Sequence, residues 1–154
     1  MSANGQPGAS VEQLYRELTD SDPVSGDAGN QSKEVVDAVT DQLFPGRRFR
    51  FDEELVKNSL DELLLVLVAL RDGDTHGKGL MEDLSQVFDA RLSPGTVYPR
   101  LHELEADDLL EMHELVRTKE YRIDDDEDTR TRIEDAMQQH LALGFVFYSA
   151  LDEL

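Results

Sequence analysis

The sequence predicts a mainly α-helical fold with one small β-hairpin. Three observations predict this class. Apolar residues recur at helical intervals in most segments from Lys33 onward, the period changes to two between residues 110 and 123, and a long stretch of helical spacing follows. With 154 residues, the chain is long enough for one compact core with extensions but not for two large domains.

Residues 1–32 are expected to form a mobile tail. They are rich in Gly, Ser, Asp and Asn, a composition that offers little apolar surface for packing. The first residues, MSANGQPGAS, lack the basic start and apolar stretch of a secretory signal. The longest apolar run, 63–70, is far shorter than the ~20 residues of a membrane span. We therefore expect a cytoplasmic protein with no membrane partner.

Residues 33–58 are predicted to comprise a short amphipathic helix and a basic arm. The apolar residues at the start of this segment lie at helical intervals, and Pro45 ends the pattern. In RRFRF, residues 47–51, arginine and phenylalanine alternate near the end. This stretch fits either a short strand or a basic arm.

The next segment is predicted to contain the central helix of the core. Ser59 and Glu62 have capping-box spacing directly ahead of LLLVLVAL, and a helix that is apolar on all sides is a buried helix. An Asp-Gly-Asp turn ends it. A second helix is expected over residues 75–89, capped by Asp74 or Thr75.

A third helix is predicted within ARLSPGTVYPRLHELEADDLLE, residues 90–111. Ser93 is the expected N-cap, and Pro94 fits the first helical position because its missing N–H would be unpaired there anyway. Pro99 lies inside the helix, where it cannot donate to the carbonyl of Gly95 and costs up to ~3 kcal/mol. We therefore predict a bent first turn that re-aims Thr96, Tyr98 and Arg100.

The remaining chain is predicted to form the hairpin and a long helix. Apolar and polar residues alternate on both sides of Arg117–Thr118, which indicates two short strands. The acidic run 124–129 suits a helix N-terminus, where carboxylates meet the positive end of the dipole. Beyond it, intervals of four and three alternate as in a coiled-coil seam. The seam comprises Ile133, Met137, His140, Gly144, Phe147, Leu151 and Leu154.

Three helices followed by a hairpin is the element order of a winged helix-turn-helix, whose third helix enters the major groove. LSPGTVYPRLHELEADDLLE further resembles the recognition helix of the PadR family of winged-helix transcriptional regulators. The residues in register are Leu92, Ser93, Pro94, Gly95, Thr96, Tyr98, Pro99, Leu101, Leu104, Glu105, Leu109 and Leu110. The resemblance implies a DNA-binding domain over residues 59–124 and a dimerisation helix over 125–154. This sequence departs from the family pattern at Asp108, where a glycine is usual.

The predicted DNA contacts lie at the start of the third helix, on the hairpin wing and on the basic arm. Exposed backbone N–H groups and a hydroxyl in a first turn suit a phosphate. The candidates are Ser93, Gly95, Thr96, Tyr98, Pro99 and Arg100 of the helix, Arg91 just before it, Arg117 and Lys119 of the wing, and Arg48 of the arm. The simpler alternative is that this segment only starts a core helix.

The charge of the chain opposes nucleic acid, because 34 acidic residues face 15 basic ones and the formal net charge is -19. DNA binding therefore requires the basic residues between 91 and 122 to share one face while the acids point away. Abundant aspartate, arginine favoured over lysine and the lack of cysteine resemble an intracellular protein of an extreme halophile. At molar salt the Debye length falls to ~3 Å, which screens this self-repulsion. We also consider cations held between the carboxylates and DNA.

No catalytic, metal or cofactor site is predicted. The four histidines are scattered, HELE at 102–105 lacks the second histidine of a zinc-protease helix, and no Gly-rich phosphate loop is present. The absence of cysteine leaves no disulfide or thiolate metal site. The competing function is an acidic protein-interaction module or DNA mimic that keeps the winged-helix scaffold.

The preferred function is a homodimeric, sequence-specific transcriptional regulator in a high-salt cytoplasm. A response to stress, through an unidentified effector, is a further hypothesis. So wide an apolar surface on the C-terminal helix would stay exposed unless another chain covered it. A two-fold dimer would place two recognition helices about one DNA turn (~34 Å) apart. The interface is predicted to contain Val39, Leu43, Met137, Leu141, Phe145, Tyr148 and Leu151.

Overall fold

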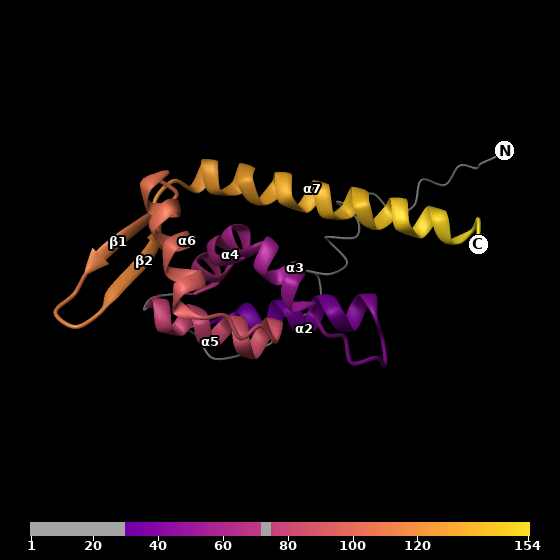
Figure 1. Ribbon diagram of the computed structural model, residues 1–154, viewed down its shortest axis with the longest axis horizontal. Coiled ribbons are helices and arrows are strands. Elements are labelled where there is room, and N and C mark those ends of the chain that lie inside the picture. The colour runs from indigo at the N-terminus through magenta and orange to yellow at the C-terminus, as the bar shows by residue number, and fades with distance from the viewer. Residues whose placement is uncertain (1–29, 72–74) are drawn as a thin grey trace.

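The computed structural model describes residues 30–71 and 75–154 and confirms a mainly helical fold with one hairpin (Figure 1). The chain order is α2 (Ser32–Leu43), α3 (Glu53–Asn58), α4 (Leu60–Leu70), α5 (Gly77–Phe88), α6 (Pro94–Ala106), β1 (Leu110–Glu114), β2 (Lys119–Ile123) and α7 (Asp126–Leu151). The predicted tail falls almost wholly outside the described residues, as does the Asp-Gly-Asp turn. In Figure 1, α7 crosses one side of α4, and α2 and α5 lie on the opposite side.

The core lies among α4, α5, α6 and the hairpin. Leu64, Leu65 and Leu67 of α4 are fully buried, which confirms the predicted central helix. They meet buried side chains of α5, α6 and the hairpin, among them Leu80, Leu84, Val97, Leu101, Leu104, Leu110 and Tyr121. Burying one leucine contributes about 1.5–3 kcal/mol, so this cluster is the main source of stability for the domain.

The chain is interrupted at Ser59, where α3 ends and α4 begins. The predicted capping box is wrong, because the Ser59 side chain makes no cap hydrogen bond. Its hydroxyl instead lies 3.2 Å from Nε2 of His140 in α7. The separate helix α3 was not predicted, and Asp52 caps it by accepting a hydrogen bond from the backbone N–H of Glu54 at 3.0 Å.

The hairpin pairs β1 and β2 antiparallel, with Leu110 opposite Ile123 and Glu114 opposite Lys119. This confirms the two strands predicted on either side of Arg117–Thr118. The segment before α5 adds to the hairpin, because the Tyr121 N–H donates to the carbonyl of Thr75 at 2.9 Å. The cap prediction for α5 is therefore wrong at Thr75, and His76 occupies the N-cap position.

Residues 47–51 form an arm that belongs to no helix or strand. Phe49 stacks on Phe44 with ring centroids 4.5 Å apart, and Phe51 packs edge-on against both Phe49 and Phe88 of α5 at 5.0 and 5.2 Å. Such aromatic pairs contribute about 0.5–1.5 kcal/mol each beyond their burial. Of the two alternatives left by the sequence, the structure favours the basic arm.

Asp108, which follows α6, has a backbone φ of +58°. This left-handed conformation is strained for most residues and free for glycine, although aspartate tolerates it better than most. Asp108, which replaces the usual glycine of the PadR motif, therefore keeps the same turn at a small conformational cost.

Tyr121 is fully buried in β2, and its hydroxyl has no hydrogen-bond partner among the described residues. Replacing Tyr121 with Phe is expected to raise the free energy of unfolding by about 1 kcal/mol, because the desolvated hydroxyl is removed.

Burial also raises the pKa of Tyr121. The unfolded wild type therefore releases this proton first, and the wild type should lose stability above about pH 10, whereas the variant keeps it. Denaturant titrations of both proteins at pH 7 and pH 11 measure these effects. Equal free energies of unfolding of the wild type and the variant at both pH values would contradict them.

Candidate nucleic-acid interface

The helix α6 begins at the surface, at the turn that the sequence singles out. Ser93 is the N-cap residue and Pro94 the first helical residue, as predicted. The expected cap bond is not made, because the Ser93 hydroxyl lies 3.1 Å from the Thr96 hydroxyl rather than accepting from a backbone N–H. These two hydroxyls and the start of the helix form a polar, accessible end suited to a phosphate.

The exposed face of α6 is lined by small and polar residues. Val97, Leu101 and Leu104 are buried on the inner face, and Gly95, Pro99 and His102 are exposed. A Cβ at Gly95 would meet only the Ser93 hydroxyl, at 3.8 Å. A DNA backbone can therefore approach this turn closely. The helix continues through Pro99, and the bend in its first turn stays a prediction.

Tyr98 lies on the side of α6 that faces α5. It is half-buried and packs on the core. A Cβ on Gly77, the first residue of α5, would lie 2.6 Å from Cε1 of its ring. The ring therefore has a packing role, which fixes α6 against α5, and the DNA contact at Tyr98 stays a prediction.

Replacing Gly77 with Ala is expected to destabilise the protein by about 1–3 kcal/mol, because the added methyl group displaces the Tyr98 ring. The matched variant Gly95→Ala has open space and should keep the stability within about 1 kcal/mol. Its methyl group would instead stand in the path of DNA, so we expect it to lower DNA affinity. Thermal unfolding and fluorescence anisotropy separate the two effects, and equal melting temperatures of the two variants would refute the packing role.

Arg100 departs most clearly from its predicted role. Its Nε and Nη2 atoms donate to the two carboxylate oxygens of Asp61 in α4, at 2.7 and 2.5 Å. The hydrogen bond to Asp61 raises the pKa of Arg100 well above its ordinary value. Arg100 is therefore paired on the α4 side of its helix, while 40% of its side chain is exposed, and its DNA contact stays a prediction.

A basic cluster lies beside the start of α6. Arg50 of the arm pairs with Asp89, the residue that ends α5 in a left-handed conformation. Arg50, and more weakly Arg91 and Arg48, hold the pKa of Asp89 below its ordinary value. Arg48 and Arg91 are both exposed. We call Arg48, Arg50 and Arg91 the arginine cluster, because all three act electrostatically on the Asp89 carboxylate and Arg50 pairs with it.

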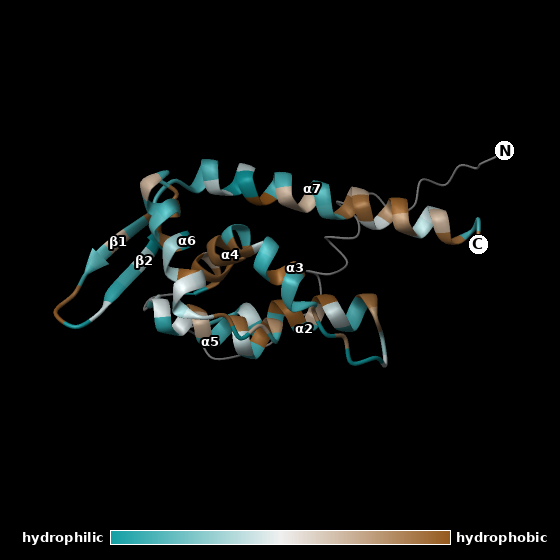
Figure 2. Ribbon diagram, viewed as in Figure 1, coloured by the Kyte–Doolittle hydropathy of each residue, from teal (hydrophilic) through white to brown (hydrophobic). Residues whose placement is uncertain are grey.

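The wing carries two of the predicted contacts on exposed positions. Arg117 and Lys119 are both exposed, whereas Arg122 pairs with the buried Glu120 at 3.4 Å. Leu115 and Val116 form an exposed apolar tip (Figure 2). The basic side chains of the wing are therefore Arg117 and Lys119 at and after its turn, and Arg122 on β2, which is 61% exposed and paired.

Comparison with known proteins gives this arrangement a family. Residues 66–129 match the model described as "Transcriptional regulator PadR-like family". The protein carries a PadR-like domain. The match includes α5, α6 and the hairpin, and therefore most of the predicted DNA contacts.

Relatives of the PadR-like domain occur in haloarchaea, in agreement with the composition. The chain is 40% identical over 101 residues to "Transcriptional activator GvpE1" of Halobacterium salinarum, covering 66% of this chain and 52% of that protein. It is 43% identical over 95 residues to "Transcriptional activator GvpE" of Haloferax mediterranei, covering 62% of this chain and 48% of that protein. The chain thus spans about half the length of each relative.

A solved structure shares the fold of the PadR-like domain. A transcriptional regulator from Clostridium thermocellum superposes with a TM-score of 0.52 at 18% identity. The superposition covers 64% of this chain and 96% of that one. The winged helix-turn-helix predicted from the element order is therefore confirmed. These relatives are named regulators, which agrees with the prediction of a protein that is not an enzyme.

Beyond the PadR-like domain, α7 exposes a broad apolar surface. Its second half is largely hydrophobic in Figure 2, and its C-terminal end projects past the core helices in Figure 1. Phe145 and Tyr148 are 54% and 69% exposed. Of the other predicted interface residues, Met137, Leu151 and Leu43 are exposed, and Leu141 and Val39 are half-buried. No helix within the described residues is long and apolar enough to cross a membrane.

The predicted seam of α7 packs on its own chain in the first half of the helix. Ile133 lies against the core, and His140 reaches Ser59. Met137 and the seam positions from Gly144 onward stay exposed in the protomer. The role of the seam in a dimer stays a prediction.

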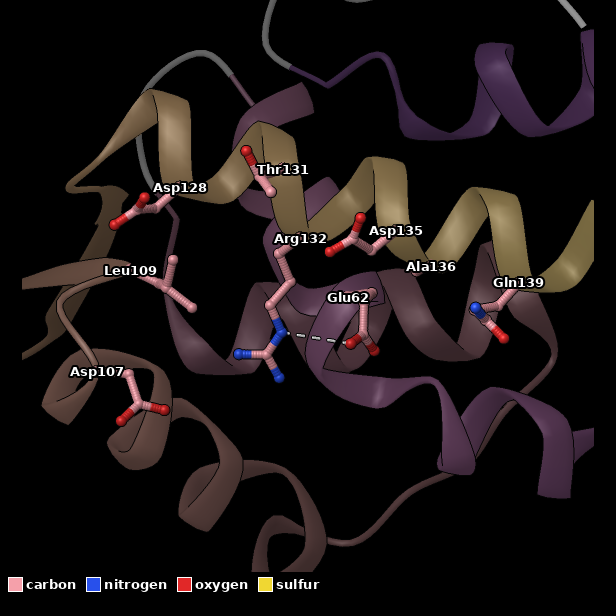
Figure 3. Close-up of a pocket in the computed structure, with 9 residues that line it drawn as sticks. All are labelled: Glu62, Asp107, Leu109, Asp128, Thr131, Arg132, Asp135, Ala136 and Gln139. Carbon is pink, nitrogen blue, oxygen red and sulfur yellow. Dashed lines mark hydrogen bonds and ion pairs between the residues drawn. The ribbon is translucent and has the colours of Figure 1, made fainter.

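An acidic groove separates the end of α6 from α7 (Figure 3). It has a volume of about 520 Å³ and is lined by the carboxylates of Glu62, Asp107, Asp128 and Asp135. Within the part of the chain that the structure describes, no three acidic or histidine side chains are grouped to hold a metal ion. The groove thus collects acids at the end of α6 opposite to the arginine cluster.

Sequence reasoning missed Asp89 and His102 near the interface and counted Arg50 only among further candidates for the basic face. Asp89 sits in the arginine cluster, Arg50 holds it there, and His102 shares the exposed face of α6 with Gly95 and Pro99. The spacing 95, 99, 102 is a signal that the sequence does contain, because such positions share one helix face. The pairing of Arg50 with Asp89 joins residues 39 positions apart and leaves no such signal.

Proposed function

We propose that the protein is a sequence-specific, homodimeric DNA-binding regulator. The recognition helix is α6, the arginine cluster and the wing bind phosphates beside it, and the projecting half of α7 joins the two protomers. The observation that carries the proposal is the accessible start of α6, where Gly95 leaves room for a DNA backbone and the exposed Arg91 precedes the N-cap residue Ser93. The match of residues 66–129 to the PadR-like regulator family supports DNA as the ligand.

The salt concentration determines how strongly such a protein binds DNA. Counterion release weakens as bulk salt rises, so phosphate contacts alone supply little affinity in a salt-rich cytoplasm. The net charge of -19 adds repulsion at low salt. We expect affinity to fall less steeply with salt than for a basic regulator, because cations between the carboxylates and DNA offset the loss.

The proposal is tested by selecting duplexes from a random-sequence library with the protein in 2 M KCl. Selected duplexes should share a two-fold symmetric motif, and anisotropy should show saturable binding to it. The competing function, an acidic interaction module or DNA mimic, is favoured by the net charge and the acidic groove. No enrichment of any sequence between 0.2 and 3 M KCl would favour that function instead.

Replacing Asp89 with Asn is expected to strengthen DNA binding by about threefold or more at 0.2 M KCl, because it removes a negative charge from the arginine cluster. The matched variant Asp152→Asn removes the same charge at the far end of α7 and should leave affinity nearly unchanged. Weaker binding of Asp89→Asn, or an equal gain in both variants, would argue against phosphate binding at the cluster.

A further inference from the structure

Asp61, near the start of α4, receives arginines from two other helices. Arg100 of α6 donates to both of its carboxylate oxygens, at 2.7 and 2.5 Å. Arg132 of α7 donates from Nη2 to Oδ2 of the same carboxylate at 3.1 Å. One side chain of α4 thus holds a residue of the recognition helix and a residue of the helix that leads to the proposed dimer interface.

The Asp61 carboxylate is shielded from solvent, since only 11% of its side chain is exposed. Salt screens partly buried pairs much less than exposed ones. The exposed pair Arg130–Glu134 on α7 should therefore weaken in concentrated salt while the Asp61 contacts persist. The bidentate geometry with Arg100 also restricts orientation, because two parallel hydrogen bonds fix the plane of the guanidinium.

Because α6 and α7 are loosely packed against each other, the Asp61 carboxylate contributes much of what fixes their relative orientation. The acidic groove lies between the end of α6 and α7, so the helices are not closely packed at that place. Figure 3 shows Arg132 extending from α7 across the groove toward Glu62 of α4, where its Nε donates at 3.4 Å. Helix α4 is in contact with both α6 and α7 and forms the common support.

We propose that Asp61 is a positioning residue that sets the orientation of α6 relative to α7. In the proposed dimer, this orientation fixes the distance and angle between the two recognition helices, and so the half-site spacing that the protein accepts. This inference rests on the proposed function. Asp61 itself touches no DNA and acts through Arg100 and Arg132.

The orientation is measured directly by spin-label distances. The chain has no cysteine, so His102→Cys on α6 and Gln138→Cys on α7 introduce a single labelled pair at two exposed positions. Mixing with excess unlabelled wild type leaves one labelled protomer in most dimers. We expect one narrow distance distribution in 2 M KCl, and a broader one when Asp61→Asn or Arg132→Gln is added. An unchanged width in both variants would overturn the inference, whether or not the protein binds DNA.

The consequence for DNA is measured on duplexes selected by the wild type, with the half-site spacing changed one base pair at a time. Asp61→Asn and Arg132→Gln should lose about fivefold or more of the discrimination between the best spacing and its neighbours. Glu103→Gln is the matched control, because Glu103 also pairs with Arg100, at 2.9 Å, but lies on α6 itself. It should retain the wild-type discrimination.

The outcomes separate the two proposals. A wild type without any spacing preference would overturn the proposed dimeric reading of DNA, and the spin-label widths would still decide the role of Asp61. Equal discrimination in the wild type and both variants would overturn the inference alone. Both arginines are partly exposed, so water can solvate them after the substitution, and circular dichroism checks that the variants are folded.

Discussion

Replacing Phe145 and Tyr148 with glutamate is expected to convert the protein into a monomer and to abolish tight binding to two-half-site DNA. Both side chains lie on the projecting half of α7 and are mostly exposed in the protomer, so the substitutions should leave its fold intact. In the proposed interface they would bury two charges per chain without partners, which is strongly unfavourable. Light scattering in 2 M KCl measures the mass, and anisotropy should show a loss of affinity of about 100-fold or more.

The control for this prediction carries the same added charge earlier on the same helix. Gln138→Glu combined with Gln139→Glu adds two carboxylates at exposed positions before the projecting half begins. This variant should remain dimeric and bind the same DNA. A dimeric Phe145→Glu, Tyr148→Glu protein would remove the apolar end of α7 from the interface.

Replacing Arg48 and Arg91 with alanine is expected to weaken DNA binding by about tenfold to 100-fold at 0.2 M KCl. Each residue that neutralises a phosphate adds about one unit to the slope of log affinity against log salt. The double variant should therefore lose about two units of slope and affect all sequences alike. Stability should change little, because both side chains are exposed and the Phe44–Phe49–Phe51–Phe88 contacts remain.

A matched pair of basic residues tests whether position matters rather than net charge. Lys33 on α2 and Arg130 on α7 are exposed, and each pairs with an acid four residues further along its own helix. Their replacement by alanine changes the net charge equally but lies outside the arginine cluster. Equal losses in the two double variants would mean that DNA senses the overall charge alone.

The sequence predicts the elements whose pattern is local. Periodicity places the buried helix α4 and the two strands, and LSPGTVYPRL places the start of α6. The break at Ser59 has no such pattern, because the Ser59 hydroxyl contacts His140, which is 81 positions away. A capping box and an interhelical contact use the same serine, and tertiary structure decides between them.

At the candidate site, the sequence likewise does not predict which charged residues pair with each other. Composition reveals that acids outnumber bases, but the partner of each arginine depends on packing. Arg100 and Asp61 lie 39 positions apart and meet only after α4 and α6 pack together. Tyr98 likewise finds Gly77 through the packing of α6 on α5. The motif therefore locates α6, the proposed recognition helix, while the side chains that its surface leaves accessible depend on the fold.

The aromatic contacts of the arm have a consequence for the entropy of binding. A basic arm that becomes ordered only on DNA loses about 1–2 kcal/mol per residue in backbone freedom. Here Phe49 and Phe51 fasten residues 47–51 to Phe44 and Phe88 before any ligand arrives, so this cost is already met in folding. In concentrated salt, the release of counterions contributes little free energy to DNA binding. Because the arm is already ordered, no ordering cost opposes the few proposed arginine contacts, and these can supply the affinity.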